Sequence, residues 1–324
     1  MATIHDVAKK AGLSVTTISR VLNNRGYISE QTRQKVYQVM EELNYHPNEI
    51  ARSLLRKRSH VIGLIVPSVS HPFFGEFASA VEHDAYQQGF KLLLCNSQLD
   101  PVKEKEYVEM MRRHRVDGMI VGSHTLDVDA YKDIQYPIIT IDREVAEHPF
   151  VASDNERGGE LAAQLLIDRG CKKIGHICGN LHLHMLSNHR TTGFQRVCEQ
   201  HDTEYVVFQT DLDAFDQSSY ASIIADMFTQ HPDLDGVFAT SDMMAGLVVK
   251  WCMQSGISVP DQLRVVGYDD VGHASWMSPG LSTIRQPIQE MGEQAVRTLI
   301  RQMNGESVEQ KNILPVELVE REST

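Results

Sequence analysis

Two stripes of apolar residues at helical spacing open the chain, the first made of Ile4, Val7, Ala8 and Ala11 and the second of Val15, Ile18, Val21 and Leu22. Gly12 interrupts the pattern between them. Ser14 is placed to cap the second helix, because its hydroxyl can accept a backbone N–H of the first turn. Two short helices joined by a tight turn predict a helix-turn-helix, although the pattern alone also fits an ordinary helical hairpin.

The second predicted helix would expose an uncharged-to-basic face once Val7, Ala8, Ile18 and Val21 pack against each other. The residues left outside are Ser14, Val15, Thr16, Thr17, Ser19 and Arg20. Such a face, at the start of a second helix, suits insertion into the major groove of DNA. A third helix is predicted from Ser29, which begins a capping sequence, to about Leu43.

A basic segment at 48–59 joins this N-terminal module to the rest of the chain. Pro47 disfavours helix at the residue before it and can start a new helix. One face of that helix would carry Ile50, Ala51, Leu54 and Leu55. The surrounding positions are basic, namely Arg52, Arg56, Lys57 and Arg58. The segment could be a solvated linker, but a helix this short is unstable alone, which favours one that forms with its dimer mate on DNA.

From His60 onward, strand and helix patterns alternate. Residues 61–66 form a continuous apolar run, typical of a strand buried on both faces. Further strands are predicted near 91–96, 118–121, 138–141, 173–177, 205–209, 236–239 and 264–268. Helices are predicted near 74–88, 103–114, 156–169, 190–201, 217–230, 242–254 and 288–303. Repeated βα units imply parallel sheets, and their number predicts two α/β lobes.

Charge is distributed unevenly along the 324 residues. The net charge of −12 argues against nucleic acid, but residues 1–60 carry ten Lys or Arg and five Asp or Glu. A basic N-terminal module on an acidic body is the charge distribution expected if the module binds the phosphate backbone of a nucleic acid. The five cysteines show no paired spacing, and neither a signal peptide nor a membrane span is evident, so a cytoplasmic protein is expected.

Polar side chains gather where the predicted strands end, and ligands of open α/β sheets bind at that edge. The segments there are 70–74, 142–143, 189–194, 213–216, 240–242, 267–270 and 283–287. Carboxylates and guanidinium groups hydrogen-bond vicinal hydroxyls in pairs, and aromatic rings cover the apolar face of a sugar, so the set predicts a polyol site. Asp242 is instead expected to cap the following helix. Met243, Met244 and Trp276 are expected to pack in the core or between lobes.

Several motifs, in order along the chain, resemble the lactose-repressor family of bacterial transcription regulators. They lie at 4–8, 11–14, 17–23 and 45–48, and the similarity continues to the C-terminus. The resemblance implies an all-α helix-turn-helix headpiece at 1–47, a hinge helix at 48–59 and a body at 60–324. That body would have two Rossmann-like lobes of the periplasmic-binding-protein type, with crossovers near 155–160, 280–290 and 310–320.

The resemblance also implies which residues bind DNA and effector. In the family, the residue at the position of Leu54 wedges into the minor groove between two half-sites. The residues expected on operator DNA are Ser14, Val15, Thr16, Thr17, Ser19, Arg20, Asn23, Tyr45, Asn48, Ala51, Arg52 and Leu54. Similarity to ribose-type binding proteins places an effector at Phe73, Asp142, Arg143, Arg190, Phe215, Ser241, Asp269 and Gln286. Ser241 stands where asparagine is common.

The function implied is a homodimeric repressor of a sugar-utilisation operon, controlled by a small sugar or sugar phosphate and using no cofactor. Four segments, at 103–107, 122–126, 283–287 and 313–316, resemble sucrose-operon repressors, which sense fructose-type sugars. Residues 70–74 and the polar set resemble ribose-operon repressors equally. Fructose or sucrose is favoured over ribose, and a purine is disfavoured. The headpiece argues against a transport component, and the lack of a catalytic constellation argues against an enzyme. The cluster His182, His184 and His189 lacks the pattern of a zinc site.

Overall fold

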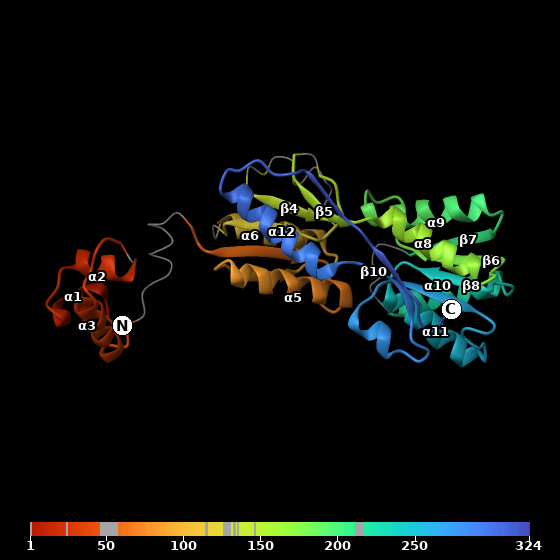
Figure 1. Ribbon diagram of the computed structural model, residues 1–324, viewed down its shortest axis with the longest axis horizontal. Coiled ribbons are helices and arrows are strands. Elements are labelled where there is room, and N and C mark those ends of the chain that lie inside the picture. The colour runs from red at the N-terminus through yellow and green to blue at the C-terminus, as the bar shows by residue number, and fades with distance from the viewer. Residues whose placement is uncertain are drawn as a thin grey trace. The chain divides into compact units, whose positions relative to one another are not determined.

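The computed structural model describes residues 2–23, 25–45, 58–113, 116–125, 131, 134, 136–145, 147–210 and 217–324. The chain divides into two compact units, Met1–Ser59 and His60–Thr324 (Figure 1). We call the second unit the body and keep the name headpiece for residues 1–47 of the first. Within the described ranges, no helix combines the length and the apolar character that crossing a bilayer requires.

The headpiece core is built by α1 (Ile4–Ala11), α2 (Val15–Leu22) and α3 (Glu30–Glu42). A polar side chain caps the start of each helix by accepting a hydrogen bond from a backbone N–H of the first turn. The capping residues are Thr3, Ser14 and Ser29. Gly12 ends α1 with φ +64°, a conformation that glycine adopts without strain. The buried core consists of Val7, Ala8, Ala11, Ile18, Val21, Val36 and Val39. The predicted helix-turn-helix, including its cap, is confirmed.

The first lobe of the body has a parallel sheet of order β11–β5–β4–β3–β1–β2. Its strands are β1 (Val61–Val66), β2 (Lys91–Asn96), β3 (Gly118–Val121), β4 (Ile138–Ile141), β5 (Phe150–Ser153) and β11 (Lys311–Leu314). Leu64 packs with α5 (Pro72–Gln87) and α12 (Ile288–Met303). Ile65 packs on the other face with α6 (Pro101–Arg113), which explains the continuous apolar run in β1.

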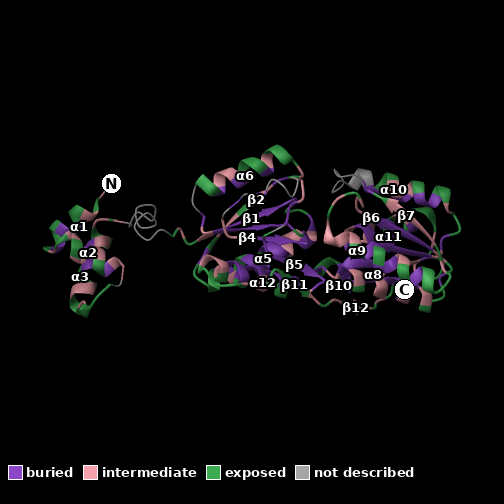
Figure 2. Ribbon diagram, turned by 90° about the horizontal axis from the view of Figure 1, so that it is seen from above, coloured by how far each residue is buried: buried purple, intermediate pink, exposed green. Residues whose placement is uncertain are grey.

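The second lobe has a sheet of order β12–β10–β9–β8–β6–β7, parallel except between β10 and β12. Its strands are β6 (Lys173–Cys178), β7 (Glu204–Gln209), β8 (Gly236–Ala239), β9 (Arg264–Asp269), β10 (Ser282–Arg285) and β12 (Glu317–Val319). Phe238 packs with α8 (Asn155–Asp168) and α9 (His189–Gln200), and Val237 packs with α10 (Gln217–Gln230) and α11 (Asp242–Ser255). Figure 2 shows the buried strands between helices with exposed outer faces.

The chain crosses between the lobes after β5, after β10 and between β11 and β12. These positions lie at or close to the predicted crossovers. The sequence pattern missed β5, β10, β11 and β12, although it predicted β3, β4 and β8, which are of similar length. Polar or charged residues interrupt β10, β11 and β12, so these strands lack the apolar run that marks a buried strand. The other strands and helices of the body lie within about two residues of their predicted bounds.

Trp276 was expected in the core or between the lobes, and this prediction is wrong. Its side chain is 77% exposed at the end of the short helix η2 (Gly272–Trp276), edge-on to His273. The residue of this helix that faces the core is Ala274, which is fully buried. Met244 is buried and Met243 partly buried in the core of the second lobe, as expected.

Candidate functional site

A cavity of about 180 Å³ lies between the two lobes of the body. It opens at the carboxyl ends of the strands in both sheets, where open α/β folds bind ligands. Asp142 directly follows β4 of the first sheet, whereas Asp269 ends β9 and Gln286 directly follows β10 of the second sheet, so strand ends of both lobes deliver them to one place. The volume lies below the roughly 300–1,000 Å³ of sites for drug-sized molecules, so the cavity suits a small ligand.

Arg190, in the first turn of α9, is the central cation of the cavity. Its Nε donates to Asn155 Oδ1 at 2.7 Å and its Nη1 donates to the carbonyl of Thr240 at 2.9 Å. The guanidinium carbon lies 3.7 Å from the ring centre of Tyr268, a cation–π contact. These contacts hold the side chain in one orientation before any ligand arrives.

Asp142 faces Arg190 from the first lobe. Its Oδ2 lies 3.9 Å from Arg190 Nη2, and its Oδ1 accepts from Asn155 Nδ2 at 3.0 Å. Burial raises the pKa of Asp142, while the charge of Arg190 and the hydrogen bond from Asn155 lower it. The backbone of Asp142 has φ +52°, an uncommon conformation for a residue with a side chain that often accompanies function.

Asp269 and Gln286 form a second polar pair in the cavity. Gln286 Nε2 donates to Asp269 Oδ1 at 2.7 Å, and Gln286 Oε1 accepts from Ser153 Oγ of the first lobe at 2.7 Å. Burial raises the pKa of Asp269 to about 7, against the lowering effects of Arg190 and Gln286. Gln286 therefore links the two lobes directly beside a carboxyl group that is poised to titrate.

Aromatic and neutral side chains complete the cavity. Phe73, Phe74 and His71 lie together at the start of α5, with edge-on ring contacts. Burial lowers the pKa of His71 and of His124 to about 4, so both are neutral near pH 7. The site thus combines an apolar wall with one arginine and two buried carboxyl groups, which can bind a ligand that carries several hydroxyls.

The structure brings together most of the predicted effector-binding residues. Those that line the cavity are Phe73, Asp142, Arg190, Ser241, Asp269 and Gln286. Arg143 is buried but is not among the lining residues, and its guanidinium lies over the ring of Tyr131 at 6.0 Å. The left-handed backbone at Asp142 accompanies this divergence of two consecutive side chains. Phe215 lies outside the described residues.

Asp242 does not cap α11, contrary to expectation. Ser241 has the extended backbone of a cap, and its hydroxyl accepts from the N–H of Met244 at 3.2 Å. Asp242 is fully buried and accepts from the N–H of Val271 at 3.0 Å and from Thr283 Oγ1 at 2.5 Å. Ser241 therefore both caps α11 and lines the cavity, while Asp242 braces the turn after β9.

Sequence reasoning missed the residue that connects the charges of the cavity. Asn155 contacts both Asp142 and Arg190 from the start of α8. Asn155 follows β5, a strand that the sequence pattern does not predict, so the pattern gives no strand end at this position. Thr240 and Tyr268, the other partners of Arg190, lie in segments that the pattern placed at strand ends.

The second candidate surface is the outer face of α2 in the headpiece. Thr16 and Arg20 are exposed, and Val15, Thr17 and Ser19 are half-buried. The hydroxyls of Ser14 and Thr17 lie 2.9 Å apart within the cap. Asn23 Nδ2 donates to the carbonyl of Ser19 at 2.8 Å, and Tyr45 packs against the headpiece core. The predicted DNA-binding residues Asn48, Ala51, Arg52 and Leu54 lie outside the described residues.

Neither a metal nor a reactive thiol is indicated in the part of the chain that the structure describes. No group of three or more His, Cys, Asp or Glu has a metal-binding arrangement there. All five cysteines are buried as free thiols, and burial raises the pKa of Cys95 and Cys178 to about 11.

Two family descriptions match the chain. Residues 3–48 match the bacterial regulatory proteins of the lacI family, and residues 163–324 match the periplasmic binding protein-like domain. The ribose operon repressor of Halalkalibacterium halodurans is 37% identical across 100% of this chain and 97% of its own length. The sucrose operon repressor of Streptococcus mutans is 38% identical, with coverage of 100% and 99%.

Solved structures of regulators from the same family have a similar fold. The lac repressor dimer bound to operator and the anti-inducer ONPF superposes with a TM-score of 0.88 at 26% identity, covering 99% of this chain and 98% of that one. A periplasmic binding protein/LacI transcriptional regulator from Alkaliphilus metalliredigens complexed with D-xylulofuranose gives a TM-score of 0.76 at 32% identity, covering 82% and 99%. The protein described here belongs to the lacI family of bacterial regulatory proteins.

Proposed function

We propose that this protein is a DNA-binding repressor of a sugar-utilisation operon whose operator affinity is set by a sugar in the cavity of the body. The observation behind the proposal is that a chain with a helix-turn-helix headpiece buries Arg190, Asp142 and Asp269 together in the lining of one small cavity. The regulatory names of its relatives support this function and argue against enzymatic activity.

The headpiece would read DNA through α2. Thr16 and Arg20 are exposed on this helix and can reach base edges, with Val15 beside them. Ser14 and Thr17 would act mainly by holding the first turn of α2. The proposed roles of Leu54 as a minor-groove wedge, and of Asn48, Ala51 and Arg52 beside it, rest on the sequence. Two headpieces on a pseudo-palindrome require a homodimer acting on cytoplasmic DNA, as the operator-bound lac repressor dimer supports.

The effector we propose is an uncharged monosaccharide. Arg190 is the only Lys or Arg among the described residues that line the cavity, and Asn155 and Thr240 already accept hydrogen bonds from it. His71 and His124 are neutral near pH 7. A sugar phosphate would bring about two negative charges beside Asp142 and Asp269, and the described lining offers no cation besides Arg190 to balance them.

Size and shape favour a single sugar ring. The cavity volume of about 180 Å³ is small for a disaccharide. A related body binds D-xylulofuranose, a ketose, which supports a fructose-type ligand over ribose. Ribose remains the alternative, because the relative from Halalkalibacterium halodurans is a ribose operon repressor.

Sugar binding would act on DNA through the angle between the lobes. Gln286 contacts Ser153 of the first lobe and Asp269 of the second, and Arg190 contacts Asp142 across the same gap. A ligand that inserts among these groups favours one arrangement of the lobes over another. Linkage then requires operator DNA to change sugar affinity by the same factor as sugar changes operator affinity.

A thermal-shift panel on the full-length protein tests the effector class. D-Fructose, D-ribose, sucrose, fructose 6-phosphate and hypoxanthine would be titrated, because specific binding raises the melting temperature with ligand concentration. Stabilisation by one free monosaccharide alone is expected. Stabilisation by the phosphate or by hypoxanthine would refute the uncharged-sugar proposal. Selection of binding sites from random DNA, followed by titration with the active sugar, tests the repressor function separately.

A further inference from the structure

The turn at the end of β9 borders the cavity, and two of its residues have positive φ angles. Asp269 and Asp270 are consecutive, with φ +114° and +55°. Residues with a side chain rarely adopt such angles, and they persist only where surrounding contacts hold them. Asp269 lines the cavity, whereas Asp270 is not among the lining residues.

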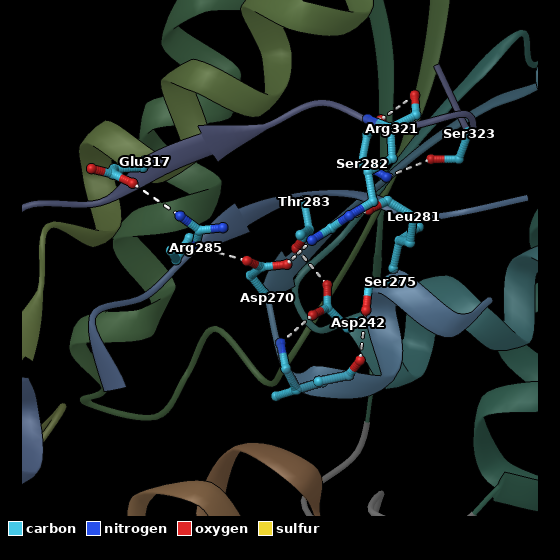
Figure 3. Close-up of polar contacts among 12 residues, drawn as sticks. Asp242, Asp270, Ser275, Leu281, Ser282, Thr283, Arg285, Glu317, Arg321 and Ser323 are labelled. Carbon is cyan, nitrogen blue, oxygen red and sulfur yellow. Dashed lines mark hydrogen bonds and ion pairs between the residues drawn. The ribbon is translucent and has the colours of Figure 1, made fainter. Parts of the chain in front are cut away.

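Two arginines from different parts of the chain hold the Asp270 carboxylate, as Figure 3 shows. Arg285 Nε donates to Asp270 Oδ2 at 2.7 Å, and Arg321 Nη2 donates to Asp270 Oδ1 at 2.6 Å. The side chains of Asp270 and Arg321 are only 7% and 18% exposed. Solvent and salt therefore screen this ion pair less than an ordinary surface pair.

Arg321 belongs to a C-terminal segment that is built into the second lobe. Its Nη1 donates to the carbonyl of Leu281 at 2.7 Å. Ser323 is fully buried, and its hydroxyl donates to the carbonyl of Val265 at 2.6 Å and accepts from the N–H of Ser282 at 2.8 Å. The segment thus lies against β9 and β10, the strands whose ends carry Asp269 and Gln286.

The ion pairs of Asp270 are connected through the backbone to the Asp269–Gln286 hydrogen bond in the cavity. Arg285 is the register partner of Asp269 in the β9–β10 ladder, and Gln286 follows Arg285. The Asp270–Arg285 ion pair therefore lies next to the Asp269–Gln286 hydrogen bond along both strands. Asp242 holds the next residue by accepting from the N–H of Val271. Three consecutive residues of the turn thus have separate side-chain partners.

We propose that Arg321 is a positioning residue of the effector site, which acts through Asp270 to hold the strained turn that presents Asp269 to the ligand. The C-terminal segment therefore contributes to effector affinity without touching the ligand. The ligand part of this inference rests on the proposed function, whereas the order of the turn can be measured in the ligand-free protein.

Arg321→Met in the full-length protein removes the charge and keeps an apolar stem of similar direction. Without sugar, we expect amide hydrogen exchange to become about tenfold faster in a peptide spanning 269–272, with residues 173–178 of β6 unchanged. The dissociation constant for D-fructose or D-ribose, whichever the wild type binds, should rise about tenfold. Arg321→Lys should restore the exchange rate and the sugar affinity part of the way to the wild-type values. Lysine keeps the positive charge but lacks the planar guanidinium group, which donates to Asp270 and to the carbonyl of Leu281 together.

Glu320→Gln is the matched control. Glu320 precedes Arg321 in the same segment, but its carboxylate pairs with Arg169 on the exposed side of the lobe. This variant should leave both the exchange at 269–272 and the sugar affinity as in the wild type.

Three results would overturn the positioning role, namely unchanged exchange in Arg321→Met, an equal change in Glu320→Gln, or faster exchange throughout the lobe including β6. If Arg321→Met does not fold, Asp270→Asn and Arg321→Lys decide the same comparison. A wild-type protein that binds neither sugar refutes the proposed effector class, and the exchange measurement still decides the role of Arg321.

Discussion

The headpiece and the cavity of the body place their polar groups in opposite ways. In residues 2–23 and 25–45, every buried residue is apolar, and the side chains proposed to read DNA are exposed or half-buried on α2. The cavity buries Asp142, Arg190 and Asp269 in its walls. The surface proposed to read DNA leaves its polar groups in water in the free protein, whereas the enclosed cavity removes its charged groups from water when the body folds.

This difference predicts how function and stability are coupled in the two regions. Exposed polar residues contribute little to folding, so the reading face of α2 can change with little effect on stability. Buried charges cost folding energy unless each one finds partners, so changes in the cavity should alter affinity and stability together.

The largest expected effect is a loss of the headpiece fold in Ile18→Ala. Ile18 is fully buried, and its truncation should cost about 2–4 kcal/mol, comparable to the whole stability of so small a core. We expect calorimetry to show loss of the headpiece transition, with operator binding abolished and sugar binding retained. Ile174→Ala, also fully buried but in β6 of the large body, is the control and should leave the body folded. Retained operator affinity in Ile18→Ala would contradict this view.

The next effect is on the cavity alone. Arg190→Met removes the hydrogen bonds to Asn155 and Thr240 and leaves Asp142 without its cation. We expect sugar affinity to fall at least about a hundredfold, roughly 3 kcal/mol, by calorimetric titration. Operator affinity without sugar should not change. Arg196→Met, an exposed position on the same helix that pairs with the partly buried Glu156 and Glu160 outside the cavity lining, should retain sugar binding. A normal response to sugar in Arg190→Met would mean that the effector binds elsewhere.

A pH-dependent effect of intermediate size should come from Asp269. Because the pKa of its carboxyl is raised to about 7 in the folded protein, its stabilising contribution is complete below about pH 4 and is lost as pH rises through 7. Asp269→Asn cannot lose a proton, so relative to the wild type it should gain about 2 kcal/mol of unfolding free energy between pH 5 and pH 8. Urea unfolding at both pH values measures this, and sugar affinity should fall.

The same comparison separates Asp269 from the buried histidines. Burial lowers the pKa of His71, His124 and His176 to about 4, so they destabilise the fold only as pH falls below about 6.5, and equally in both proteins. An identical stability difference between wild type and Asp269→Asn at pH 5 and pH 8 would rule out the raised pKa.

The smallest effects come from removing a helix N-cap in each of the two regions. Ser14→Ala and Ser241→Ala each remove a helix cap, at a cost of about 1 kcal/mol. The melting temperature should fall further for the headpiece than for the body, because a smaller unit has a smaller unfolding entropy. Ser29→Ala, which removes the cap of α3, is the control for Ser14. Equal shifts in the two regions would indicate that the headpiece and the body unfold as one unit.

Much of the fold could be predicted from the sequence, because its signals are local. The helical stripes around Gly12, the cap at Ser14 and the apolar run of β1 each depend on residues a few positions apart. Short strands such as β10 and β11 escaped, since polar and charged residues interrupt their apolar pattern. Trp276 escaped because hydrophobicity alone does not say which side of a short helix faces the core.

The sequence by itself determined that the chain carries a helix-turn-helix on an acidic α/β body, and which strand ends supply Asp142, Arg190 and Asp269. Only the tertiary structure decided that Asn155 joins two of these charges, that Arg143 lies outside the cavity lining, and that Arg321 stands behind Asp269. Helices and caps arise from neighbours along the chain. Sites such as Gln286 with Ser153 join residues 133 positions apart, and only the packing of two lobes brings them into contact.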